Sequence, residues 1–175
     1  MSNLEKQLIE AYNNYSDGVF RYGVFKLSDR ELANDLVQET FLRAWKFMVK
    51  GGRIDNYKAF LYKIMSNLVI DEYRKRTDPA SLETMHEEEG FDPPFDDTHR
   101  WMDQIDGMQA IKMIRRIPLP YSEAVFMRYV QELSLSEIAA ITGKRENTVA
   151  VHVHRGLEKL KELIKSESQF SKHIQ

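Results

Sequence analysis

The sequence contains no cysteine, so disulfides and thiolate zinc sites are excluded, and the composition fits a reducing cytoplasm. It also has no run of 18 apolar residues, so we expect no insertion into a membrane. Glu5, Lys6 and Glu10 interrupt the apolar pattern at the N-terminus, so we expect neither a signal peptide nor a transit peptide there. These absences favour a cytoplasmic protein, and the hydrophobic content of 42% is enough for packed cores.

The motifs of common enzymes and metalloproteins are missing as well. The sequence shows no Gly-rich phosphate loop, no nucleophile triad and no converging pair of carboxylates. His152 and His154 would point well apart on a helix, and His86 stands beside a run of glutamates, so we predict no metal site. We expect a protein that is not an enzyme, with no cofactor and no small-molecule substrate.

No stretch alternates strictly between apolar and polar residues, and helical periodicity takes its place. The fold class we predict is all-α, with two small helical domains joined by an acidic linker. Residues 1–77 form the first domain, with helices at Asn3–Lys26, Ser28–Trp45 and Tyr57–Arg76. Ser28 and Glu31 would form a capping box for the second helix, and Gly51-Gly52 would form a flexible loop after it.

Charge is distributed unevenly along the chain, although the net charge is only −2. Residues 1–77 carry 13 basic and 10 acidic residues, residues 78–107 carry 1 and 10, and residues 108–175 carry 11 and 7. Two basic segments therefore flank an acidic connector. We assign residues 78–107 to the linker and the start of the next helix, which begins near His99. Residues 108–165 form the second domain, and residues 166–175 a frayed polar tail.

The second domain ends in a predicted helix-turn-helix. Ser134 and Glu137 form a capping box, Gly143 supplies a left-handed helix stop, and a second helix begins near Glu146. Such a helix can enter a DNA major groove. An ordinary pair of helices, with no DNA to bind, is the alternative.

Four separated runs together resemble a known family. They are SDRELANDLVQETFLRAWKF, NYKAFLYKIMSNLVIDEYRKR, IPLPYSEAVFMRYVQELSLSEIAAITG and the helix after it. In this order they resemble the extracytoplasmic-function sigma factors, small bacterial members of the sigma-70 family that keep only regions 2 and 4. The resemblance covers about residues 10–77 and 108–163. It implies a transcription initiation factor that binds core RNA polymerase, directs it to promoters and helps melt them.

The resemblance assigns one set of residues to polymerase docking. These are Asp35, Leu36, Gln38, Glu39 and Phe41. Asp35 and Glu39 are one helical turn apart, beside Gln38, and would form an exposed patch next to an apolar face. A solvated charged face is the alternative interpretation.

A second set on the third helix is implied to contact the melted minus-ten element. Its members are Lys58, Lys63, Asn67, Asp71, Arg74 and Lys75. The loop Lys50–Lys58 matches the family segment that captures a flipped base. Asp71 has two open interpretations, because it could also pair with Arg74 or Lys75 for purely structural reasons.

A third set is implied to meet the minus-thirty-five element. It comprises Lys144, Arg145, Thr148, Ala150, Val151, His154, Arg155 and Lys159. Ala150 and Val151 stand where polar or basic residues are common in the family, which favours contacts with thymine methyls over guanine. Val151 could instead pack against protein.

The partners implied are core RNA polymerase, promoter DNA and an anti-sigma factor. Two rivals remain open. One is a conventional helix-turn-helix regulator that binds duplex DNA without polymerase, and the other is an interaction protein that docks on polymerase without reading promoters.

Overall fold

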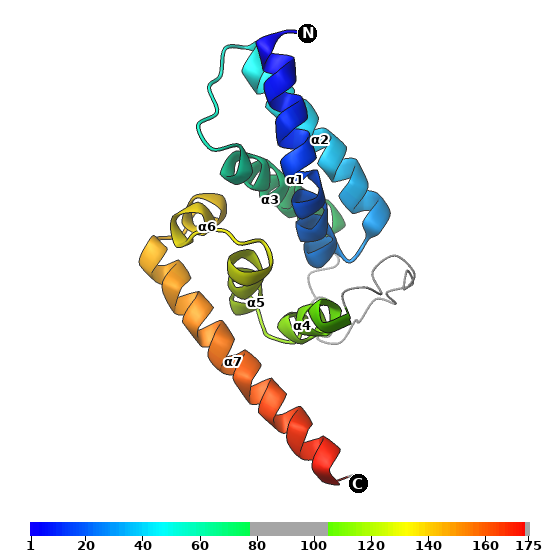
Figure 1. Ribbon diagram of the computed structural model, residues 1–175, viewed down its shortest axis with the longest axis vertical. Helices are drawn as coiled ribbons and strands as arrows, with labels where there is room; N and C mark the ends of the chain where they lie inside the picture. Colours follow the sequence, from blue (N-terminus) through cyan, green and yellow to red (C-terminus); the bar gives the residue numbers. More distant parts are fainter. Residues whose placement is uncertain (78–104, 174–175) are drawn as a thin grey trace. The chain divides into compact units, whose positions relative to one another are not determined.

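The computed structural model describes residues 1–77 and 105–173, and every regular element in these two ranges is a helix. The chain divides into two compact units, Met1–Pro94 and Phe95–Gln175 (Figure 1). The all-α prediction is confirmed for the described residues. The predicted connector lies almost wholly outside them, as do His86 and His99, so the domain boundaries stay predictions.

Each unit has its own set of helices. The first unit contains α1 (Asn3–Leu27), α2 (Arg30–Val49) and α3 (Tyr57–Arg76). The second contains α4 (Ile105–Arg115), α5 (Tyr121–Val125), a π-helical turn (Phe126–Val130), α6 (Leu135–Thr142) and α7 (Glu146–His173).

The three helices of the first unit pack closely around Gly23. In Figure 1, α1 and α2 lie side by side and α3 crosses them. A Cβ added to Gly23 of α1 would lie 2.2 Å from Met65 Cε of α3 and 3.2 Å from Ala33 Cβ of α2. All three residues are buried, so a larger side chain at position 23 would push the helices apart.

The start of α2 differs from its prediction, and the expected Ser28–Glu31 capping box is wrong. Asp29 is the N-cap, and its Oδ1 accepts a hydrogen bond from the Leu32 amide at 2.9 Å. Ser28 instead ends α1 in a left-handed conformation, with φ 54°, and its amide donates to the Val24 carbonyl. Both residues favour caps, so helix periodicity could not decide between them.

The loop after α2 begins as a defined turn. Gly51 has φ +86°, a conformation that costs glycine little. The Gly52 amide donates to the Phe47 carbonyl at 3.0 Å, and a Cβ on Gly52 would fall 2.3 Å from the Phe47 ring. The two glycines therefore let the chain fold closely over this ring.

In the second unit, α5 lies against α7 at another glycine. A Cβ on Gly156 would lie 2.4 Å from Val125 Cγ2 and 3.0 Å from the Tyr121 carbonyl oxygen. A glycine within a helical pattern is the sequence signal for such an approach. The core around this contact is apolar. It includes Ile114, Ile117, Val125, Phe126, Met127, Leu133, Ile138, Ile141, Val149 and Val153.

The helix-turn-helix has the predicted local structure. The Ser134 hydroxyl accepts from the Glu137 amide, and the Glu137 carboxylate accepts from the Ser134 amide, which confirms the capping box. Gly143 ends α6 with φ 70°. The second helix, α7, begins at Glu146 as predicted.

The segment before the helix-turn-helix changes from α-helical to π-helical at Phe126, and Glu132 follows with φ 54°. The predicted frayed tail is wrong for residues 166–173, because α7 continues to His173. Among the described helices, none combines the length and apolar character needed to cross a membrane.

Candidate nucleic-acid and protein interfaces

The exposed face of α2 carries the residues assigned to polymerase docking. Asp35 and Gln38 are exposed and Glu39 is half-buried, whereas Leu36 and Phe41 are each only 7% exposed. The three polar residues therefore form a surface patch, and the two apolar ones support it from the core. We call Asp35, Gln38 and Glu39 the acidic patch.

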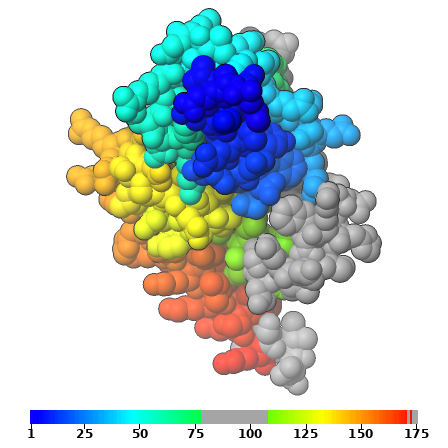
Figure 2. Space-filling view, turned by 45° about the horizontal axis from the view of Figure 1, so that its top comes forward, coloured from blue at the N-terminus to red at the C-terminus, as the bar shows by residue number. Residues whose placement is uncertain are grey.

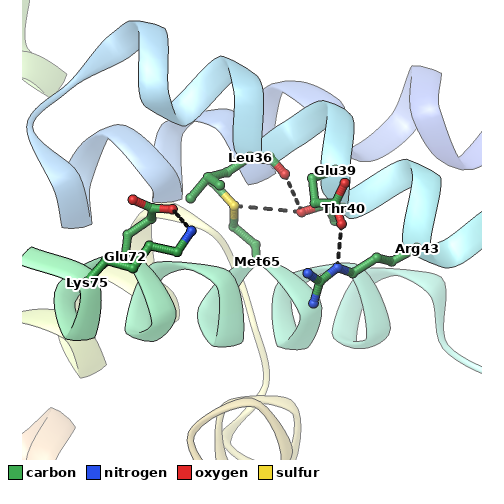
Figure 3. A network of polar contacts seen from close by, with 7 residues as sticks. All are labelled: Leu36, Glu39, Thr40, Arg43, Met65, Glu72 and Lys75. Atoms are coloured by element: carbon green, nitrogen blue, oxygen red, sulfur yellow. Dashed lines mark hydrogen bonds and ion pairs between the residues drawn. The ribbon is translucent and has the colours of Figure 1, made fainter.

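Glu39 does not stand alone in this patch. Its Oε1 lies 2.7 Å from Arg43 Nε, one turn along α2 (Figure 3). The hydrogen bond from Arg43 lowers the pKa of the Glu39 carboxyl, so Glu39 stays charged at neutral pH. The side chains of Arg43 and Glu39 are 48% and 38% exposed, so a partner can compete for either member of this pair at little cost.

Beneath the patch, a buried hydroxyl links α2 to α3. Thr40 is fully buried, and its Oγ1 donates to the Leu36 carbonyl at 2.7 Å (Figure 3). The same hydroxyl lies 3.7 Å from Met65 Sδ on α3. The polar atom is thus satisfied inside an apolar core, and the patch rests on a fixed support.

A polar stripe on the surface of α3 carries residues assigned to the minus-ten element. Asn67 and Arg74 are exposed, and Lys63 and Asp71 are half-buried. Asp71 Oδ1 lies 3.8 Å from Arg74 Nη1, so of the two structural partners considered for Asp71 the structure has Arg74. Lys75 pairs with Glu72 instead, at 3.0 Å (Figure 3).

The C-terminal end of α3 is anchored to the turn between α1 and α2. The Tyr73 hydroxyl donates to the Lys26 carbonyl, and Arg76 Nη2 lies 3.9 Å from Asp29 Oδ2. Each of the three basic residues Arg74–Arg76 therefore has a carboxylate neighbour. Exposed pairs of this kind contribute about 0–1 kcal/mol each, so phosphate groups can replace the carboxylates.

An aromatic pair that sequence reasoning missed flanks the loop predicted to capture a base, with one ring on α2 and the other on α3. Phe47 and Phe60 have ring centroids 5.0 Å apart, and Phe47 is partly exposed. In the same loop, Arg53 Nε lies 2.9 Å from Asp55 Oδ1, and Lys58 is half-buried. Phe47 is 13 positions from Phe60, so no helical spacing relates the two rings.

The outward face of α7 carries most of the residues assigned to the upstream element. Lys144, Arg145, Thr148, His154 and Arg155 are exposed. Ala150 is half-buried, and Val151 is 44% exposed. The interpretation that Val151 packs against protein is therefore wrong.

Lys159 lies on a different side from the one its assignment implies. Its Nζ sits 5.4 Å from the centre of the Tyr121 ring on α5, and the residue is half-buried. The same ring meets His152 edge-on, with centroids 5.6 Å apart. Tyr121 therefore braces one face of α7, which no local pattern indicated because its partners are more than 30 residues away.

The surroundings of His152 change the pKa of its side chain. Burial lowers the pKa of its imidazole, and the positive charges of Lys144 and Arg155 lower it further. The neutral ring is therefore favoured beside Tyr121. Within the described ranges, no group of three or more histidines and carboxylates could hold a metal ion.

Comparison with protein families bears on both units. Residues 11–78 match the model of sigma-70 region 2, and residues 107–160 match the model of sigma-70 region 4. Together these matches cover most of the chain, in the order expected. The chain belongs to the sigma-70 family.

Curated relatives named ECF RNA polymerase sigma factors match most of this chain. The chain is 28% identical to the ECF RNA polymerase sigma factor BldN of Streptomyces coelicolor, over 90% of this chain and 60% of that protein. It is 26% identical to SigE of Mycolicibacterium smegmatis, over 91% of this chain and 62% of that protein. For SigW of Bacillus subtilis the identity is 27%, over 86% of this chain and 85% of that protein. The chain thus spans less than two thirds of the length of BldN and SigE.

A solved structure shares the fold. It is the sigma factor RpoE of Bartonella quintana, solved in complex with the anti-sigma factor NepR. The TM-score is 0.65 at 22% sequence identity, covering 94% of this chain and 98% of that one. The helical fold of this chain is therefore also found in the solved structure of a sigma factor.

Proposed function

We propose that this chain is an extracytoplasmic-function (ECF) sigma factor that binds core RNA polymerase, directs it to specific promoters and helps melt them. The observation that carries the proposal is the outward face of α7, where His154 and Arg155 project from a capped helix-turn-helix. Membership of the sigma-70 family favours a protein that acts while bound to RNA polymerase over one that binds duplex DNA alone. Since both partners belong to the transcription machinery, we place the protein in the cytoplasm.

The acidic patch on α2 is the proposed docking site for polymerase. Its carboxylates are exposed, lie on one face and rest on the buried Thr40 contact. Leu36 and Phe41 would act indirectly, by fixing the helix that carries the patch. A basic surface on the polymerase would complement this site.

The stripe Lys63, Asn67 and Arg74 on α3 is the proposed site for the melted strand. It joins amide and guanidinium groups, which can bind both base edges and phosphates. Lys58, Lys75 and Asp71 border it, and Asp71 would orient Arg74 through their 3.8 Å contact. The partly exposed Phe47–Phe60 pair offers a ring on which an unstacked base could lie.

On α7 and the turn before it, the phosphate contacts would come from Lys144, Arg145, Thr148 and Arg155. The groove contacts would come from Ala150, Val151 and His154. Lys159 contributes less, because Tyr121 holds its ammonium group. The apolar Val151 favours a thymine methyl at its position. We further propose that the protein has an anti-sigma partner and performs no catalysis.

Co-purification tests the proposal against a conventional regulator. The tagged full chain is incubated with core RNA polymerase and passed over an affinity column. A sigma factor retains polymerase in stoichiometric amount without DNA, whereas a conventional regulator retains none. Run-off transcription from a promoter recovered with the complex then separates a sigma factor from a protein that only docks.

A further inference from the structure

A pair of polar side chains on the outward face of α7 stands out from its surroundings. His154 Nε2 lies 3.3 Å from Glu158 Oε1, one helical turn further along (α7 in Figure 1). The side chains remain 74% and 59% exposed. The pair is thus available to a ligand on the face proposed to meet DNA.

The pair supplies hydrogen-bond acceptors beside Arg155, an exposed side chain that can only donate. Toward the N-terminus, Ala150 and Val151 have only apolar side chains to offer. Lys159, the residue next to Glu158, is drawn onto the Tyr121 ring at 5.4 Å. A carboxylate therefore projects from this face where a cation would be expected on a DNA-binding helix.

The chemistry of the pair decides what it can bind. A neutral imidazole has one N–H donor and one acceptor nitrogen, and a carboxylate only accepts. When Nε2–H of His154 points to Glu158, the groups left over are Nδ1 and the carboxylate oxygens. All of them are acceptors.

We infer that His154 and Glu158 act together as a specificity element that accepts a hydrogen bond from a base amino group, of cytosine or adenine, in the upstream promoter element. In the major groove, only these two bases present amino donors, whereas guanine presents two acceptors. The inference rests on the proposed function. Glu158 is a positioning residue for His154 and an acceptor in its own right.

The test is a selection of promoters by the holoenzyme. Templates with a randomised upstream element are bound at about pH 8, where ordinary imidazole is neutral, and the bound fraction is sequenced. The variants are Glu158→Ala and His154→Ala, each of which removes one acceptor group. Glu162→Ala is the matched control, because it removes a carboxylate from an exposed site one turn further along α7.

The parent and the control should enrich cytosine or adenine at one shared position, by roughly 5- to 150-fold over guanine. Both variants should lose that preference at that position alone, with unchanged melting temperatures, since the pair is exposed. The same base preference in Glu158→Ala as in the parent would overturn the inference and leave the proposed function standing. No enriched upstream element in the parent would overturn the proposed function itself, and this inference with it.

Discussion

Asp29 Oδ2 lies 3.9 Å from Arg76 Nη2, and this contact joins the start of α2 to the end of α3. The other carboxylate oxygen of Asp29 accepts the capping hydrogen bond from Leu32. One side chain therefore caps the N-terminus of α2, the helix that carries the acidic patch, and also forms an ion pair with the basic C-terminal end of α3.

The cap should account for most of the stability that Asp29 contributes. We expect Asp29→Ala to lower the free energy of unfolding by about 1 kcal/mol, because the Leu32 amide loses its acceptor. Asp29→Asn keeps a capping oxygen and loses only the exposed pair with Arg76, so its loss should stay below about 0.5 kcal/mol. Urea denaturation measures both. Ser28→Ala is the control, and a greater loss for Ser28→Ala than for Asp29→Ala would contradict the assignment of the cap.

Charge reversal in the acidic patch should remove polymerase binding and leave the fold intact. The double variant Asp35→Lys, Glu39→Lys should fail to retain core polymerase on an affinity column. Its stability should fall only slightly. The lost pair between Glu39 and Arg43 is exposed, and the like charges then present at positions 39 and 43 cost about 0.2–0.5 kcal/mol. Glu10→Lys reverses an exposed charge on α1 as the control. Unchanged retention of polymerase by the double variant would remove this face from the docking site.

The stripe on α3 should matter after polymerase has bound. Asn67→Ala or Arg74→Ala should weaken formation of the open complex more than initial closed binding, because both are assigned to the unstacked strand. Permanganate reactivity of thymines in the transcription bubble reports melting directly. Asn13→Ala on α1 serves as the control for an exposed amide. Equal reactivity in Arg74→Ala and the parent would count against the assignment.

His152 should make the second unit less stable in acid. Its folded-state pKa lies below the ordinary value of 6.5, through burial and then the charges of Lys144 and Arg155. The unfolded chain therefore binds more protons as the pH falls from about 6.5 to the folded-state pKa, and stability is lost across that window. His152→Phe keeps a ring beside Tyr121 without titrating, so its melting temperature should change less between pH 7.5 and 5. An equal loss in parent and variant would show that other groups cause the effect.

Local signals predicted the elements whose ends are set by their own residues. The spacing of apolar residues gave α3 its bounds Tyr57–Arg76, and the capping box placed the start of α6. Such patterns failed where two neighbours compete for one role, as at Ser28 and Asp29.

Contacts between helices that are far apart in the sequence could not be predicted from such local patterns. The hold of Tyr121 on Lys159 depends on how α5 crosses α7, which no helical spacing encodes. The exposure of Val151 likewise became clear only once the buried face of α7 was known. Among the candidate site residues, position on a helix face was thus predictable, whereas the partner of each side chain was not.

Mapping of transcript 5′ ends tests the central claim most directly. Fragmented genomic DNA is transcribed in vitro by core RNA polymerase, with and without the purified chain, and the 5′ ends are sequenced. We predict a set of start sites that appear only with the chain, that share two upstream sequence elements, and that vanish with the Asp35→Lys, Glu39→Lys variant. Identical start sites with and without the chain would contradict the claim that it is a promoter-directing sigma factor.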